Sequence, residues 1–300
     1  MAEPHWISIL AALTRRYPFY SGCGTFANHP LMNALAPGSG REPVWAKAPG
    51  GDVRADLSDY VGRAVYFFGD LDPKITWILG RLLGPGDQAL DIGANIGVLS
   101  LWMSKLVGPQ GSVHAFEPNP VLCQVLEDTF VHNRAMNVKL HRFGLGASDS
   151  QLQLHVPKGN FGGASFIRKT GEMAQLHTVP VRRLDEVIEQ ENISHISLLK
   201  IDVEGYELEV FKGARRVLEI LRPAALLFEA NEKTAPGQIA PVIQFLHQCE
   251  YEFVMIPRSL IRVRTKVVDL SRPATIKGHD LVAAPSGALF ARLREKLAAA

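Results

Sequence analysis

One short segment, residues 90–97 with the sequence LDIGANIG, constrains the fold of this chain more than any other. It has the pattern of a buried strand that breaks into a glycine-containing turn and continues as a helix. About one βα unit later, a second apolar strand ends in the acid Glu117. An open α/β sheet places such a turn and such an acid side by side at the carboxyl ends of neighbouring strands, where adenosine-containing cofactors bind.

The residue sequence of the turn favours S-adenosylmethionine over a dinucleotide as the cofactor. A G-x-G-x-x-G fingerprint that began at Gly93 would need glycine at positions 95 and 98, where Asn95 and Val98 stand. The motif present is D-x-G-x-N-x-G, in which Asp91 precedes the turn and Gly97 ends it. We therefore expect S-adenosylmethionine as the cofactor, and a nucleotide-binding oxidoreductase built on the same sheet is the alternative.

The residue types of this motif suit that cofactor. Gly93 and Gly97 lack a Cβ atom, so the backbone can turn sharply and lie against a ligand. Asp91 is expected beside the amino-acid end of the cofactor, where its charge favours the ammonium and sulfonium groups. Glu117 is expected to accept hydrogen bonds from both ribose hydroxyls. The competing interpretation is a structural glycine turn with Glu117 on the surface.

A second acidic motif follows the fourth predicted strand, in the sequence KIDVEG of residues 200–205. Alternate residues of a strand share a face, so Lys200 and Asp202 project together near the edge where ligands bind. Charged residues on a central strand are costly unless they are paired or used. Our hypothesis is that Asp202 is the catalytic base or orients the acceptor hydroxyl, assisted by Glu204 and Lys200. The alternatives are a Lys200–Asp202 ion pair, a helix cap at Glu204, and for Glu229, another acid at this edge, a surface or capping position.

Other side chains compete for these roles. His114 lies within the second predicted strand and is expected in the core, whereas the sequence gives less indication of the surroundings of His195 and His279. A lone histidine is more often structural than catalytic. Basic residues gather between positions 258 and 277 and can engage an anionic acceptor, although a solvated edge is the favoured interpretation.

The remaining chain reads as alternating strands and helices. Near-continuous apolar strands separated by helices indicate a mostly parallel sheet covered on both faces. The expected strands are residues 89–92, 112–116, 138–143, 198–203 and 225–229, with a terminal pair at 251–256 and 279–284. Between the third and fourth strands we expect a β-hairpin insertion, whose loop at residues 160–165 is either a mobile lid or a simple turn.

The ends of the chain differ from this main body. Residues 1–70 are rich in proline and glycine, with a hairpin expected between residues 44–47 and 53–57. This extension is expected to fold over the main domain, residues 71–285, as a cap or as part of the acceptor pocket. The main domain opens with a helix that Asp72 caps and Pro73 begins. Residues 286–300 are expected to form a helical tail.

Composition excludes several classes of protein. A formal net charge of +2 gives no sign of nucleic-acid binding. Cys23, Cys123 and Cys249 are far apart and odd in number, so we expect neither a disulfide framework nor a metal site from them, and a reducing cytoplasm fits. The apolar run at residues 7–13 is too short to span a membrane. An oligomer is possible but nothing indicates one.

Taken together, these motifs resemble the FkbM family of S-adenosylmethionine-dependent methyltransferases. The matching stretches are residues 90–97, 114–118, 181–185, 199–214 and 227–229. The resemblance covers roughly residues 60–285 and implies a class I, Rossmann-like methyltransferase fold. It also implies methylation of a hydroxyl on a sugar, polyketide or other natural-product acceptor.

The resemblance also completes the set of expected site residues. Asn95 is the residue this family usually carries within the turn, so it joins Asp91, Gly93, Gly97 and Glu117 as a cofactor-binding residue. Asp202 belongs to both the cofactor-binding and the catalytic sets. A non-catalytic cofactor-binding module remains a rival interpretation, although every residue of the motif is present.

Overall fold

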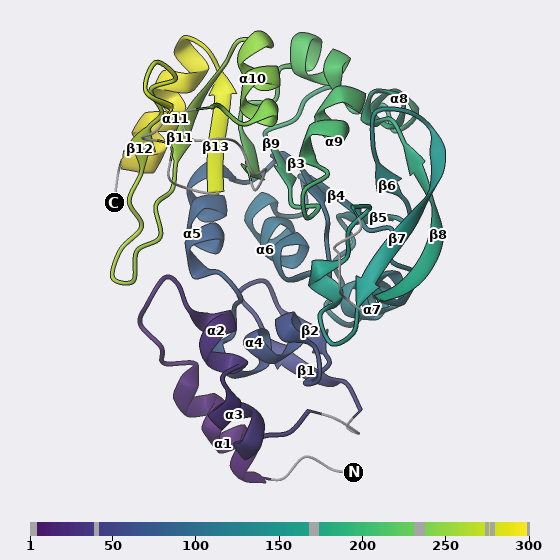
Figure 1. Cartoon of the computed structure of the whole chain (residues 1–300), viewed down its shortest axis with the longest axis vertical. Helices are drawn as coiled ribbons and strands as arrows, with labels where there is room; N and C mark the ends of the chain where they lie inside the picture. Colours follow the sequence, from purple (N-terminus) through teal and green to yellow (C-terminus); the bar gives the residue numbers. More distant parts are fainter. Residues whose placement is uncertain are drawn as a thin grey trace.

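The computed structural model describes residues 5–38, 42–167, 174–230, 238–273, 276 and 280–298. Within them, an α/β core surrounds one central sheet of eight strands (Figure 1). In spatial order the strands are β12 (Lys266–Val267), β11 (Tyr251–Met255), β13 (Asp280–Pro285), β10 (Leu226–Glu229), β9 (Leu198–Ile201), β3 (Gln88–Ile92), β4 (Ser112–Phe116) and β5 (Val138–His141).

The direction of these strands confirms the expected class I methyltransferase arrangement. The five strands from β5 to β10 are parallel, whereas β13 runs antiparallel to both β10 and β11. The chain leaves β3 towards β4 and β5, then returns to β9 on the other side of β3. This reversal of strand order opens a crevice at the carboxyl ends of β3 and β9, where ligands bind in open α/β sheets.

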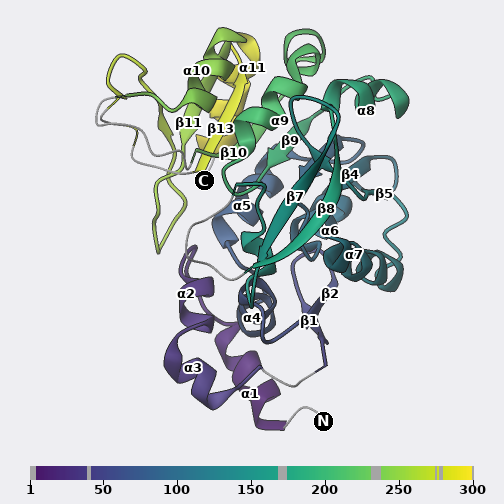
Figure 2. The same cartoon turned by 45° about the vertical axis from the view of Figure 1, so that its right-hand side comes forward.

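Helices cover both faces of the sheet (Figures 1 and 2). One face packs against α8 (Leu184–Gln190), α9 (Glu207–Gly213) and α10 (Pro241–Gln248). The other face packs against α5 (Pro73–Leu82), α6 (Val98–Val107) and α11 (Ala288–Ala298), with α7 (Pro120–His132) beside α6. Alternation along β3 sets the two cores, because Leu90 and Ile92 face α8–α10 while Ala89 faces α5 and α6.

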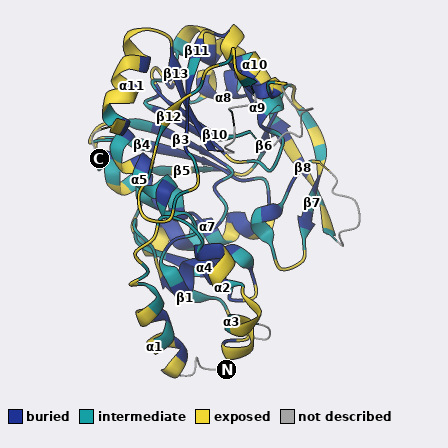
Figure 3. Ribbon diagram, turned by 60° about the vertical axis from the view of Figure 1, so that its left-hand side comes forward, coloured by how far each residue is buried: buried dark blue, intermediate teal, exposed yellow. Residues whose placement is uncertain are grey.

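Figure 3 shows the result of this packing: buried residues line the central strands, and the outer faces of α1 and α11 are exposed. The tail helix α11 buries Phe290, Leu293 and Leu297 against the sheet, as the predicted helical tail requires.

The N-terminal extension forms a body at the lower end of Figure 1, against the carboxyl edge of the sheet. It contains α1 (His5–Thr14), α2 (Cys23–Ala27), α3 (Pro30–Leu35), the hairpin β1 (Val44–Lys47) with β2 (Asp52–Ala55), and α4 (Tyr60–Phe68). The buried guanidinium of Arg63 donates to the carbonyls of Ala27, Met32 and Ala36 and so joins α2, α3 and α4. Apolar residues of this body share one cluster with α6 and α7. The predicted hairpin is confirmed, whereas the domain boundaries at residues 70 and 285 stay a prediction.

The insertion is the predicted hairpin, β7 (Ser150–Pro157) and β8 (Ala174–Arg182), joined by the short β6 (Gly144–Leu145) into a separate sheet. Its 3-10 turn η1 (Phe161–Gly163) reaches α4, where the Phe161 amide donates to Asp59 Oδ1 at 2.7 Å. Figure 2 shows the hairpin lying in front of the main sheet.

Three local predictions need correction. The third strand ends at His141 rather than residue 143, because the chain leaves the main sheet to pair Gly144 with β8. The fourth strand ends at Ile201 rather than residue 203. Asp72 precedes α5 but makes no capping hydrogen bond, because its carboxylate contacts the Lys74 ammonium instead.

Candidate active site

A cavity of about 560 Å³ lies at the carboxyl ends of β3, β9 and β10. One wall is the turn after β3, from Gly93 to Ile96, and the opposite wall comes from α2 and α4 of the N-terminal extension. We call it the main cavity. A narrower cavity of about 60 Å³, which we call the inner cavity, lies between the ends of β3 and β4 and the insertion. Gly93, Asn95 and Asp202 line both cavities.

The glycine turn depends on close packing rather than on flexibility. Gly93 has φ +81°, and a Cβ atom there would lie 1.9 Å from the carbonyl oxygen of Asp202. Gly97 has φ +90°, and its Cβ would lie 2.9 Å from Leu126 of α7. Asn95, between these two glycines, has a left-handed φ of 53°, which asparagine adopts more readily than most residues. The turn therefore brings bare backbone to the junction of the two cavities.

Glu117 ends β4 beside this turn. Its carboxylate is buried and accepts one hydrogen bond from the amide of Asn95 and one from the amide of Asn119, each at 2.9 Å. Burial raises the pKa of Glu117 to about 7, opposed by these hydrogen bonds. A carboxylate can accept about four hydrogen bonds. The two backbone amides use two of these positions, so the Glu117 carboxylate can accept further hydrogen bonds from a ligand in the inner cavity. The interpretation that placed Glu117 on the surface is wrong, and its contact with the ribose stays a prediction.

Asp91 lies within β3, and its side chain points away from both cavities. Its side chain is fully buried, where Oδ2 accepts a hydrogen bond from Ser100 of α6 at 2.6 Å and Oδ1 lies 2.9 Å from the ammonium of Lys200. Strand alternation turns this carboxylate towards α6, and it belongs to the wall of neither cavity. The structure thus gives Asp91 a part in holding the turn, and its direct contact with the cofactor stays a prediction.

Lys200 connects β9 to the glycine turn. Its ammonium lies 2.9 Å from Asp91 and 4.0 Å from Asp202, and it donates to the carbonyl of Gly93 at 2.8 Å. Burial by itself lowers the pKa of Lys200, but the two carboxylates outweigh it and raise the pKa. The side chain is therefore a fixed cation, which cannot act as a base. The Lys200–Asp202 ion pair of the alternative interpretation is present, and Asp91 is the nearer of the two carboxylates.

Asp202 is the acid most open to the site. Its side chain is 45% exposed and faces both cavities. Partial removal from water raises the pKa of Asp202, with Lys200 opposing the rise and Glu204 adding to it. Glu204 also lines the main cavity, and it adopts φ 53°, a left-handed conformation that costs non-glycine residues of order 1–3 kcal/mol. The structure thus brings Asp202 and Glu204 to the main cavity, as predicted, and their catalytic roles stay a prediction.

A buried charged group on the far wall was not foreseen. The ammonium of Lys74 lies 2.5 Å from Asp72 and 2.9 Å from Asp280. Beside it, Asp70 accepts hydrogen bonds from the Thr76 hydroxyl and the Asp72 amide, and burial raises the pKa of Asp70 to about 6. The local sequence indicates this charged group only through the acidic run Asp70-Leu71-Asp72, in which Asp72 was predicted to cap a helix.

Of the rival candidates, the described histidines lie outside the two cavities, whereas Glu229 and Arg258 line the main one. His114 is buried on β4 against His141 and lines neither cavity, and His195 is exposed. His279 falls outside the described residues. Glu229 lines the main cavity. Of the basic segment, Arg258 lines the same cavity, whereas the described basic residues Arg262, Arg264, Lys266 and Arg272 are exposed to solvent.

Two further predictions concern the cysteines and membrane-spanning helices. Cys23, Cys123 and Cys249 are buried free thiols. Among the described residues, no helix combines the length and the apolar character that crossing a bilayer requires.

Comparison with known proteins gives the same family as the motifs. The family model of the methyltransferase FkbM domain matches residues 91–253. Methyltransferase sdnD of Sordaria araneosa is 32% identical over 187 residues, covering 52% of this chain and 70% of that protein. Hexuronic acid methyltransferase AglP of Haloferax volcanii is 27% identical, covering 62% of this chain and 74% of that protein.

A third relative is the 31-O-demethyl-FK506 methyltransferase FkbM of Streptomyces tacrolimicus, which is 32% identical over 45% of this chain and 62% of its own length. The chain thus spans less than two thirds of some curated relatives. A solved methyltransferase FkbM from Methylobacillus flagellatus superposes with a TM-score of 0.44 at 15% identity, covering 75% of this chain and 65% of that one. Because the family model spans more than half of the chain, the chain belongs to the FkbM family of S-adenosylmethionine-dependent methyltransferases.

Proposed function

We propose that this protein transfers a methyl group from S-adenosylmethionine to a hydroxyl oxygen of a sugar or natural-product acceptor. The observation that carries the proposal is the position of Asp202, whose carboxylate lines both the inner and the main cavity. A group at that junction can contact a cofactor on one side and an acceptor on the other.

The acceptor group and the walls of the inner cavity fit the adenosine part of the cofactor. Glu117 offers acceptor positions for the ribose hydroxyls, and Phe143, Leu145 and Leu122 offer apolar surface for a purine ring. The turn at Gly93 and Asn95 would carry the remainder of the molecule towards the main cavity. When bound, the cofactor supplies a methyl group that its sulfonium has already activated.

The inner cavity must widen to admit that ligand. Its volume of about 60 Å³ is far below the roughly 300–1,000 Å³ typical of pockets that bury a small-molecule ligand. Phe161 and Gly162 of η1 and Phe166 form part of its wall. We therefore favour the lid interpretation of the loop at residues 160–165 over that of a simple turn. The lid would pivot on the hydrogen bond that joins Phe161 to Asp59.

The charges of the main cavity favour a polyhydroxyl acceptor without negative charge. Six carboxylates line it against three cations: Asp70, Asp72, Asp202, Glu204, Glu229 and Asp280 against Lys74, Lys200 and Arg258. Carboxylates accept hydrogen bonds from hydroxyl or amino groups and repel a phosphate or uronate. A neutral or amino sugar, or a hydroxylated macrocycle, is therefore preferred over the anionic acceptor that the basic segment suggested.

The chain's own residues can then perform two tasks. The walls of the main cavity would align the acceptor hydroxyl, and such alignment can remove roughly 7–11 kcal/mol of a barrier. Asp202 would take the hydroxyl proton, a contribution of about 10²–10⁴-fold in rate. Lys200 would act as a positioning residue, because its ammonium holds the turn and lies 4.0 Å from Asp202.

The first test is calorimetric titration with S-adenosylmethionine, S-adenosylhomocysteine and NAD. We expect both adenosyl compounds to bind and NAD not to bind. Glu117→Ala should weaken their binding about tenfold to a hundredfold, because hydrogen bonds to a charged group contribute roughly 1.5–3 kcal/mol. Glu186→Ala is the matched control, since Glu186 is an exposed acid of α8 and lines neither cavity. Binding of NAD alone would instead favour the oxidoreductase interpretation.

The second test is methyl transfer to a panel of neutral, amino and acidic sugars and hydroxylated macrocycles, followed by mass spectrometry. At saturating cofactor, Asp202→Asn should lose roughly a hundredfold or more in turnover. Full turnover by that variant would exclude Asp202 as the base. Cofactor binding without transfer to any acceptor would favour the non-catalytic module.

A further inference from the structure

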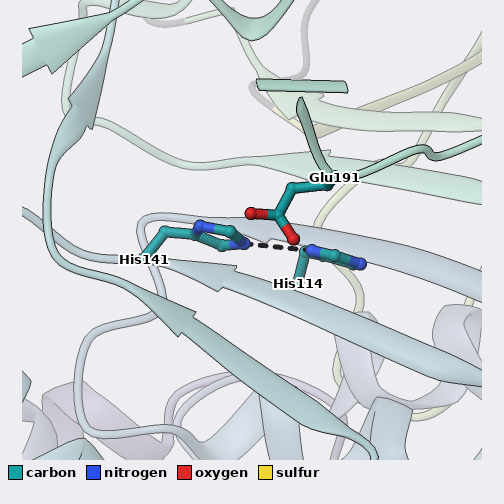
Figure 4. A group of neighbouring side chains, drawn as sticks. All are labelled: His114, His141 and Glu191. Carbon is teal, nitrogen blue, oxygen red and sulfur yellow. Dashed lines mark hydrogen bonds between the residues drawn. The ribbon is translucent and has the colours of Figure 1, made fainter. Parts of the chain in front are cut away.

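Two histidines and a glutamate converge behind the inner cavity (Figure 4). His114 comes from β4, His141 from the end of β5, and Glu191 follows α8. His114 Nδ1 lies 3.0 Å from His141 Nε2, and one carboxylate oxygen of Glu191 lies within 4.8 Å of one ring nitrogen of each histidine. Both rings are buried, whereas the side chain of Glu191 is 20% exposed and gives the group an opening to solvent.

We propose that His114, His141 and Glu191 bind a divalent transition-metal ion of the zinc class. Imidazole and carboxylate are ligands that such ions accept, and zinc sites commonly combine them. Tetrahedral zinc with ligands at about 2.0–2.1 Å places two ligand atoms about 3.3 Å apart. The observed separation of 3.0 Å between the two ring nitrogens lies close to that value, and rotation of the two rings, which now face each other through a hydrogen bond, would turn both lone pairs to one ion.

The protonation of the rings suits this role. Burial lowers the pKa of His114 and, together with the charge of the neighbouring ring, lowers the pKa of His141 to about 4. Neutral imidazole is the form that binds metals. One hydrogen now lies between the two facing nitrogens, and moving it to an outward nitrogen of the same ring frees both lone pairs without releasing a proton.

The surrounding residues indicate a structural ion. The ring of His141 stacks on Phe116 at 4.4 Å and meets Phe143 edge-on at 5.6 Å. Both phenylalanines line the inner cavity, and the amide of Glu117 donates to the His141 carbonyl at 3.1 Å. None of the three ligands lines either cavity. A bound ion would therefore tie β4, β5 and the end of α8 together behind the cofactor, outside the reacting groups.

A lysine now competes for the carboxylate. Lys139 pairs with His114 across the β4–β5 ladder, and its ammonium lies 2.5 Å from Glu191 Oε2. Its side chain is 59% exposed, so it can release the carboxylate into contact with an ion and extend into water. Metal binding therefore breaks the exposed Lys139–Glu191 ion pair, which contributes little to stability, and replaces it with a bond between Glu191 and the ion.

The test uses the full chain, freed of metal with EDTA and dialysed. Zn²⁺ is titrated by calorimetry and Co²⁺ by visible absorption, which reports on coordination geometry. We expect one equivalent of either ion to bind. His114→Gln and Glu191→Gln should each weaken Zn²⁺ binding by at least about tenfold to a hundredfold, the loss that even an outer partner of a metal ligand can cause. Lys139→Gln should bind Zn²⁺ more tightly.

His247→Gln is the matched control, because His247 is an exposed histidine on α10. It should leave binding unchanged. The proposal is overturned if the parent protein binds less than one equivalent, or if Glu191→Gln and His114→Gln bind Zn²⁺ as tightly as the parent. Because Glu191 is partly exposed, Glu191→Gln should fold normally, which circular dichroism checks. Metal binding is measured without the cofactor, so the outcome is independent of methyl transfer.

Discussion

The buried ion pair between Lys200 and Asp91 gives the sharpest prediction. Its atoms lie 2.9 Å apart, and the two side chains are 6% and 0% exposed. Lys200→Met keeps a similar apolar stem but removes the ammonium that also donates to the Gly93 carbonyl. The variant would leave the carboxylate of Asp91 buried with only the Ser100 hydroxyl as its partner.

The expected cost follows from that burial. Breaking a buried ion pair by removing one member costs about 3–5 kcal/mol, whereas replacing both members is often close to neutral. Lys200→Met should therefore lose about 3–5 kcal/mol of unfolding free energy, a large part of the roughly 5–15 kcal/mol typical of a protein. The double variant Lys200→Met with Asp91→Asn should recover most of this loss, because asparagine can still accept from Ser100.

Urea unfolding followed by circular dichroism measures these free energies, with a second probe to check two-state behaviour. Lys212→Met is the matched control, because Lys212 makes an exposed ion pair with Glu209 at 2.6 Å. It should change stability by less than about 1 kcal/mol. The reasoning is refuted if Lys200→Met loses no more unfolding free energy than this control. It is also refuted if the double variant loses as much unfolding free energy as Lys200→Met and Asp91→Asn lose when measured separately and added.

Three further predictions concern the glycine turn, the buried acid Asp70 and the anchor of the insertion. Gly93→Ala should lose more than about 3 kcal/mol or fail to fold, because its Cβ meets the Asp202 carbonyl at 1.9 Å; Gly86→Ala, with a similar φ of +85° and nothing within 4 Å, should lose only about 1–2 kcal/mol in the same urea assay. Burial raises the pKa of Asp70 from 3.8 to about 6, so the folded state binds this proton more tightly than the unfolded state, and its contribution to stability falls as pH rises through this window. Asp70→Asn should remove up to about 3 kcal/mol of that pH dependence, and equal slopes of unfolding free energy against pH in the two proteins would contradict the assignment. Asp59→Ala should cost about 2–3 kcal/mol and speed proteolysis of the insertion, because three backbone amides lose their acceptor; unchanged proteolysis would show that Asp59 does not anchor η1.

Local patterns were sufficient for the main elements. The alternation of apolar strands and helices predicted β3 and β4 with nearly the observed bounds, because each lies in a segment of consistent apolar periodicity. Capping residues carry similar local information, since the Asn119 side chain accepts from the Val121 amide at the start of α7. The helix α4 was missed although Asp59 caps it and Gly69 ends it, because the glycine and proline content of residues 1–70 dominated the interpretation.

The partners of individual side chains were harder to foresee. The sequence alone placed Asp91, Glu117, Lys200 and Asp202 at one edge of a parallel sheet, because strand period and strand ends follow from local residue order. It did not show that Asp91 faces α6 and holds Lys200, because that depends on which face of β3 each helix covers.

The sequence by itself therefore determined the family, the sheet and the glycine turn, all of which rest on short contiguous motifs. The tertiary structure decided which charges meet. His114 and His141 lie 27 residues apart in the chain, and the acids of the main cavity come from four separate segments, so no local spacing records either group. Packing brings such residues together, and in the low-dielectric interior it then sets which carboxylates are paired and which can react.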